Sequence, residues 1–111
     1  MTTFTQIDET TLAADHGITD EKGRAIGGIA YIGETGKWVR ESETFIPDGG
    51  YCFRVQAARD GKDFGATTRS NKARCVTIEG AMEGARRALI TQGNRYRESY
   101  EKTAAPAAAI A

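Results

Sequence analysis

The side chains best suited to catalysis in this sequence of 111 residues are few and lie far apart. His16 is the only histidine, and Cys52 and Cys75 are the only cysteines. His16 stands next to Gly17 at the foot of an expected strand, which favours a surface residue at a turn over a general base. Nothing identifiable would lower the pKa of the Cys52 thiol enough to make it a nucleophile. The sequence therefore predicts a protein that is not an enzyme and that has no cofactor.

Metal binding and disulfide formation are also disfavoured. One histidine and two cysteines fall short of the four ligands of a zinc site. Cys52 and Cys75 are 23 positions apart in a chain with the features of an intracellular protein, where thiols stay reduced. We expect both cysteines to be buried free thiols.

Polar side chains that could recognise a nucleic acid gather around one expected hairpin, at residues 51–69. Arginine and glutamine can form paired hydrogen bonds to base edges, while arginine and lysine hold phosphates. The candidates on the exposed face of the hairpin, and in the basic stretch that overlaps it, are Arg54, Gln56, Thr67, Arg69, Lys72 and Arg74.

Two aromatic residues, Tyr31 and Trp38, are candidates for a protein-binding surface. Aromatic side chains dominate binding hot spots, although at strand positions they belong to a core more often. Net charge is zero, with 15 basic and 15 acidic residues, whereas a dedicated nucleic-acid domain usually has a strong basic excess. Residues 1–50 carry a net charge of −5 and residues 51–111 carry +5.

The elements that must position these residues follow from a regular spacing of turn signals. Asp20-Glu21-Lys22-Gly23, Glu34-Thr35-Gly36, Pro47-Asp48-Gly49-Gly50 and Asp60-Gly61 separate segments rich in strand-forming residues. We predict strands near 16–19, 24–33, 37–46, 51–59 and 62–69, with one more possible at Phe4–Asp8 and a helical turn possible at 9–16. The fold class is α+β: an antiparallel meander of about four to five strands with one long C-terminal helix packed on one face.

The hairpin at 51–69 is the most specific of these predictions. Asp60-Gly61 favours a two-residue type I′ turn, in which both residues have positive φ. That turn sets Arg59 opposite Lys62 and Ala57 opposite Phe64, and then Val55 opposite Ala66. The same register puts Phe53 opposite Thr68 on the buried face.

The long helix begins after Thr77, which is expected to be its N-cap. Its apolar stripe includes Met82, Ala85 and Leu89, and Gly93 is expected to end or kink it. Residues 1–102 form the single domain, and residues 103–111 form a flexible tail rich in alanine. Large aliphatic and aromatic core residues are scarce, which favours a homodimer that covers apolar surface through the open sheet face or around Tyr96 and Tyr100.

Two resemblances add to this picture. The order of three strands and a helix, with Lys62-Asp63-Phe64-Gly65-Ala66 leading to Thr77-Ile78-Glu79-Gly80-Ala81, resembles the ethylene-response-factor and phage-integrase arm-site DNA-binding domains. These families lay a sheet in the major groove. The segment Phe53–Lys62 followed by an alanine-rich helix that ends in Asn94-Arg95-Tyr96-Arg97 is similar to small phage and prophage accessory proteins. That likeness implies binding to a host or viral protein complex, for example as a host-defence inhibitor, or a role in decorating a virion.

Protein binding is therefore the first functional hypothesis. Nucleic-acid binding by the hairpin face is the second, and a structural role in a virion is the third. The N-terminal sequence has no features of a signal peptide, and no apolar run is long enough to cross a bilayer. We expect a cytoplasmic protein with no membrane contact.

Overall fold

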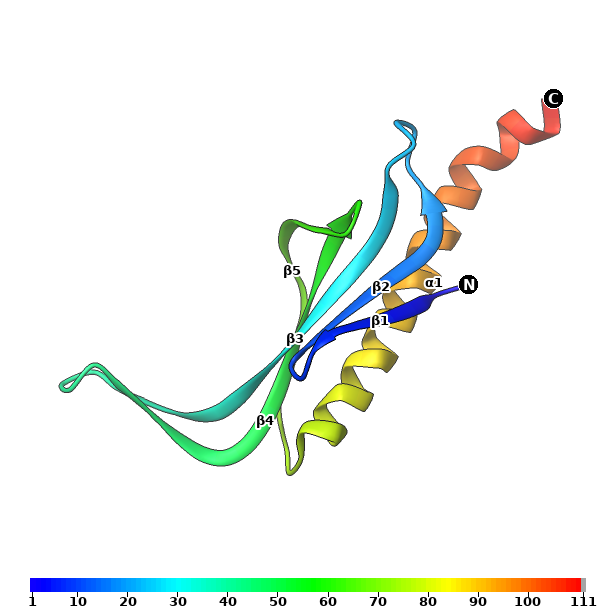
Figure 1. The fold of residues 1–111 in the computed structure, drawn as a ribbon. Helices are drawn as coiled ribbons and strands as arrows, with labels where there is room; N and C mark the ends of the chain where they lie inside the picture. Colours follow the sequence, from blue (N-terminus) through cyan, green and yellow to red (C-terminus); the bar gives the residue numbers. More distant parts are fainter. Residues whose placement is uncertain (111) are drawn as a thin grey trace.

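A computed structural model shows an antiparallel sheet with one long helix packed on it (Figure 1), which confirms the predicted α+β class. It describes residues 1–110, with side chains at 1–63 and 74–99. The five strands are neighbours in chain order. The elements are β1 (Thr3–Asp8), β2 (Thr11–Thr19), β3 (Ala25–Val39), β4 (Thr44–Arg59), β5 (Lys62–Cys75) and α1 (Ile78–Ile110).

The core lies between α1 and one face of the sheet. Alternate residues of the strands point toward the helix, as the period of two of a strand requires. The core is thin because five of its eleven residues are alanines, which let the helix lie close to the sheet. The cluster consists of Leu12, Ala14, Ala30, Ile32, Phe53, Val55, Ala81, Met82, Ala85, Ala88 and Leu89.

The N-terminal strands differ from one part of the prediction. Phe4–Asp8 does form a strand within β1, as suggested, but residues 9–16 do not form a helical turn. They belong instead to a two-residue turn and to β2, which pairs with both β1 and β3. Leu12 and Ala14 face the core at alternate positions. This alternation is typical of a strand and not of a helical turn.

The second correction concerns two of the predicted turns. Glu34-Thr35-Gly36 and Pro47-Asp48-Gly49-Gly50 lie inside strands, where they face each other across an irregularity in the β3–β4 pairing. The chain reverses at residues 40–43 instead, where Glu43 has a positive φ of 49°. β3 and β4 are therefore a single hairpin of 15 and 16 residues, in place of separate strands at 24–33, 37–46 and 51–59.

The 51–69 hairpin is confirmed at its turn and corrected farther along. Asp60 and Gly61 have φ values of 51° and 77°, as a type I′ turn requires. Arg59 pairs with Lys62 and Ala57 with Phe64, as predicted. Beyond Ala57 the register shifts repeatedly, because β5 contains extra residues, and Val55 pairs with Arg69 and Phe53 with Asn71.

Helix α1 begins as predicted, because the Gly80 N–H donates to the Thr77 hydroxyl over 3.0 Å. It continues through Gly93, which is buried against β2, so this glycine does not end the helix. A Cβ at Gly93 would lie 2.6 Å from His16 Nδ1, which shows how closely the helix approaches the strand. The mobility expected for residues 103–111 stays a prediction.

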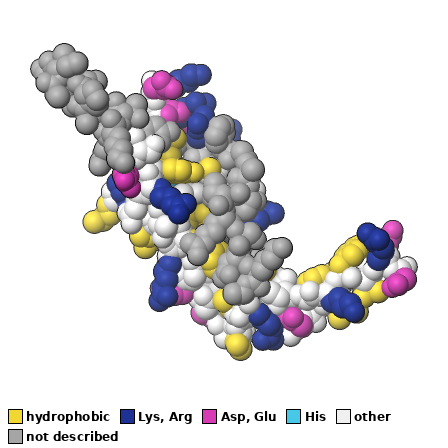
Figure 2. Space-filling model, turned by 180° about the vertical axis from the view of Figure 1, so that it is seen from behind, with side chains coloured by type: hydrophobic (Ala, Val, Ile, Leu, Met, Phe, Trp, Pro, Cys, Tyr) yellow, Lys and Arg dark blue, Asp and Glu magenta, His cyan; other side chains and the backbone are white. Residues whose placement is uncertain are grey.

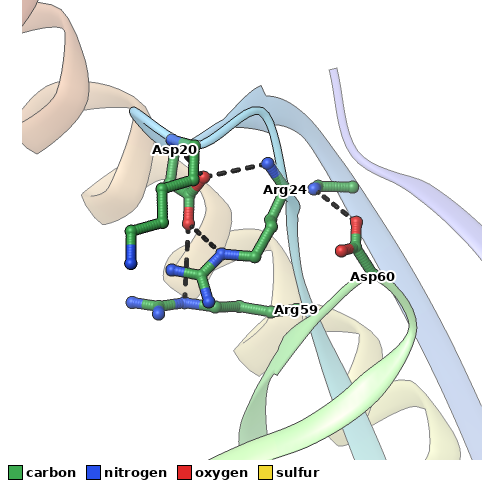
Figure 3. A network of polar contacts seen from close by, with 6 residues as sticks. Asp20, Arg24, Arg59 and Asp60 are labelled. Carbon is green, nitrogen blue, oxygen red and sulfur yellow. Dashed lines mark hydrogen bonds and ion pairs between the residues drawn. The ribbon is translucent and has the colours of Figure 1, made fainter.

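A polar network joins two turns at one end of the sheet (Figure 3). Asp20 accepts hydrogen bonds from the N–H groups of Lys22 and Arg24 and forms a 2.8 Å ion pair with the Arg24 guanidinium. Asp60 receives the N–H of Ala25 over 2.9 Å, which ties the β4–β5 turn to the start of β3. Burial alone would raise the pKa of Asp20, but the bonds from Arg24 and Lys22 outweigh it and lower the pKa.

Candidate functional site

The feature most open to a partner is the distal half of the β3–β4 hairpin, residues 33–50, which we call the arm. The arm projects away from the sheet and helix (Figure 1). All of its residues are exposed except Thr35, Val39 and Gly50. Within the residues that the structure describes, no other strand pairs with this part of β3 or β4. An isolated two-stranded hairpin is only marginally stable in water and is stabilised when it packs against something else.

Three large apolar side chains lie on the arm in the open. Trp38 is 59% exposed, Ile46 is 53% exposed and Phe45 is 41% exposed. Trp38 pairs with Phe45 across the two strands, so both lie on one face, while Ile46 pairs with Lys37 on the opposite face. Figure 2 shows apolar side chains along the arm with charges of both signs between them.

The base of the arm is held by Asp48. Its Oδ1 accepts the Thr35 hydroxyl over 2.6 Å, the Gly50 N–H over 3.0 Å and Nε of Arg74 over 3.3 Å. Arg74 also donates from Nη2 to the Asp48 carbonyl over 3.0 Å. These bonds, with the Thr35 hydroxyl first, hold the pKa of the Asp48 carboxyl below its usual range. Gly49, with φ of 82°, makes the bend that was predicted as a turn.

The candidate residues for nucleic-acid binding are only partly brought together. Arg54 and Gln56 lie on the sheet face opposite the helix, and the backbone pairs Gln56 with Thr67. Arg69 pairs with Val55, a core residue, so the register does not place it in the row of Arg54 and Gln56. The side chains of Thr67, Arg69 and Lys72 lie outside the described residues.

Other residues already engage two of these cations. The Arg54 guanidinium stacks over the Tyr31 ring at 4.8 Å, and the Tyr31 hydroxyl donates to Asp63 over 2.7 Å. This hydrogen bond raises the pKa of Tyr31. Arg74 is bonded to the carboxylate and the carbonyl of Asp48 at the base of the arm. Tyr31 is therefore a half-buried part of the sheet surface, whereas Trp38 is exposed.

His16 corrects the sequence prediction most sharply, because it is fully buried and not a surface residue at a turn. Two extra residues, His16 and Gly17, bulge from β2 between the pairs Asp15–Gly27 and Ile18–Ile26. Both ring nitrogens are in use: Nε2 lies 2.7 Å from Gln92 Oε1 on α1, and Nδ1 lies 3.0 Å from the Thr2 hydroxyl. His16 therefore anchors the helix and the N-terminus to the sheet.

The cysteines are free, as predicted, but each is half-buried where full burial was expected. No group of three metal-binding side chains occurs in the described part of the chain. Among the same residues, no helix has the length and apolar character needed to span a membrane. No protein-family model, curated protein or solved structure matches the chain.

Proposed function

We propose that this protein is a small, non-enzymatic binding protein that engages a protein partner through the arm. The observation that carries the proposal is the exposure of Trp38, Phe45 and Ile46 on a projecting hairpin. Tryptophan is the residue most enriched in interface hot spots, and exposed apolar patches mark interaction sites. The likeness to phage accessory proteins makes a host or viral protein complex the partner class.

Charge supports a protein partner over a nucleic acid. The arm carries two basic residues, Lys37 and Arg40, against four acidic ones, which gives it a net charge of −2. A surface with net negative charge gains nothing from counterion release on a phosphate backbone. On the alternative surface, the open sheet face, Arg54 is stacked on Tyr31, whose hydroxyl is bonded to Asp63.

The test is capture followed by a measured affinity. The tagged protein is incubated with nuclease-treated lysate of the cell in which its gene resides, and the retained polypeptide is purified. Its affinity is then measured for the wild type, Trp38→Ala and Phe45→Ala. Ile7→Ala is the matched control, because Ile7 on β1 is 58% exposed but lies outside the arm.

Truncating a hot spot costs upward of about 2 kcal/mol, so we expect Trp38→Ala to lose at least about tenfold in affinity. Ile7→Ala should bind as the wild type does. Equal binding by the wild type and both arm variants would refute the proposal. Retardation of DNA that is sensitive to salt and lost in Arg54→Glu would instead favour the open sheet face as a nucleic-acid surface.

A further inference from the structure

The arm also has a free backbone edge on β3. The pairing of β2 with β3 ends at Thr11–Tyr31, and the Ile32 N–H donates to the Thr10 carbonyl over 2.8 Å. Backbone groups of a strand point to opposite sides at alternate residues, so Glu34, Gly36 and Trp38 direct their N–H and C=O groups the same way as Ile32. Within the described chain, no strand covers that edge beyond Ile32.

Pro47 supports this assignment independently and makes the two edges of the arm unequal. Gly36 pairs with Pro47, which has no N–H, so this must be a pair without mutual hydrogen bonds. The backbone groups of Gly36 therefore point outward, in agreement with the alternation from Ile32. On the β4 side, Pro47 occupies the outward-facing position and offers no donor. The β3 edge of the arm therefore lacks no outward N–H donor, whereas the β4 edge lacks the one at Pro47.

We propose that a second copy of this chain pairs with the β3 edge of the arm, antiparallel and about a twofold axis at Trp38. The two arms, each a marginally stable pair of strands, would then form one sheet of four strands. Three or more strands are needed for a sheet to be stable by itself. A twofold contact uses the same surface on both copies, which a single free edge satisfies. This inference rests on the edge of the arm and leaves both its faces available for the partner proposed above.

The side chains favour this register over those centred on Lys37 or Gly36. Centred on Trp38, the pairing gives a row of Phe45 and Trp38 from one copy followed by Trp38 and Phe45 from the other, and aromatic cross-strand pairs are stabilising. Centred on Lys37, it would put like charges directly opposite each other. Centred on Gly36, it would bring the acidic tip, with Glu41 and Glu43, against the turn after Asp8.

Proline variants test the edge. Trp38 and Phe45 form one pair without mutual hydrogen bonds, so proline at either position removes an outward N–H and an aromatic ring but spares the ladder within the arm. Light scattering should show twice the monomer mass for the wild type and for Phe45→Pro, and the monomer mass for Trp38→Pro. A monomeric wild type at millimolar concentration, or dimeric Trp38→Pro, would overturn the proposal.

Disulfide trapping tests the register with Trp38 intact. In a Cys52→Ser, Cys75→Ser background, Lys37→Cys and Val39→Cys are made separately and oxidised alone or mixed. A twofold axis at Trp38 puts residue 37 of one copy opposite residue 39 of the other, so only the mixture should crosslink. Crosslinking of Lys37→Cys alone would refute the register. If the wild type is a monomer but Trp38→Ala still loses affinity for the captured partner, the dimer is refuted and the proposed function stands.

Discussion

His16 and Gln92 lie 76 residues apart in the chain and meet at 2.7 Å, between Nε2 of the imidazole and Oε1 of the amide. Gln92 Nε2 donates to the Gln56 carbonyl, which directs Oε1 toward the histidine as an acceptor. An amide oxygen only accepts, so His16 carries a proton on Nε2, and in the neutral imidazole Nδ1 is then free to accept the Thr2 hydroxyl. Arg97 completes the chain by donating to the His16 carbonyl over 2.9 Å. The network fits a neutral imidazole.

Stability should therefore fall as His16 is protonated. Burial lowers the pKa of His16 from 6.5, and the nearby Arg97 charge and the N-terminal amine lower it further, against the opposing effects of Gln92 and Asp15. Below pH 6.5 the unfolded chain therefore binds more protons than the folded one. The contribution of His16 to the free energy of unfolding is complete above pH 6.5 and declines as the pH falls toward the pKa in the fold.

Urea unfolding from about pH 7 to about pH 5 measures this slope, in a range above the titration of ordinary carboxylates. His16→Asn should be less stable throughout and should lack the slope. A wild type whose free energy of unfolding is constant over this range would contradict a neutral, buried His16.

Two glycines of β3 make a matched pair for the packing of α1. A Cβ at Gly28 would lie 2.7 Å from Leu89 Cδ2 and would also collide with Gln92 Oε1, whereas one at Gly33 would meet nothing within 4 Å. Overpacking a site of this kind typically costs about 1–3 kcal/mol. Gly28→Ala should lose that much free energy of unfolding, and Gly33→Ala should stay within about 0.5 kcal/mol of the wild type. Equal values for both variants would show that the helix does not press on β3 at Gly28.

The Asp48 contacts should control the order of the arm more than the stability of the whole protein. Asp48→Asn weakens the bond to Arg74, so amide hydrogen exchange should speed up in residues 33–50 and stay unchanged in β2. Because the pKa of Asp48 is lowered in the fold, the same loosening should appear in the wild type as the pH falls below 3.8. Glu41→Gln at the tip of the arm is the control. Unchanged exchange in Asp48→Asn would mean that other contacts hold the arm.

Local rules predicted the fold well where one residue type has one structural use. Asp60-Gly61 predicts a type I′ turn because both positions need positive φ, and Thr77 predicts a cap because its hydroxyl satisfies an early helix N–H. The register beyond Ala57 was wrong because the extra residues of β5 leave no mark in the alternation of the sequence. Each bulge leaves an extra residue unpaired and shifts the register of every pair beyond it.

The arm could not be predicted from the sequence, because some of its residues are typical of turns but lie within strands. Pro47-Asp48-Gly49-Gly50 has the composition of a turn, but its glycines make a bend in which Thr35 and Arg74, from two other strands, bind Asp48. Trp38 was identified as a candidate, while its exposure depends on a hairpin tip that the sequence marks only weakly. His16 was misplaced because its partner Gln92 lies on a helix whose approach to β2 is a tertiary property.

Trp38 is the only tryptophan in the chain, so it gives a direct test of the claim that the arm binds a protein. With 5-fluorotryptophan incorporated, the ¹⁹F NMR spectrum contains one signal, and unlabelled partner adds none. We predict that this signal shifts or broadens, and saturates at a fixed ratio as the captured partner is added, because an exposed ring becomes buried. If calorimetry on the same sample shows that the partner binds while the Trp38 signal stays unchanged, the arm is not the binding surface.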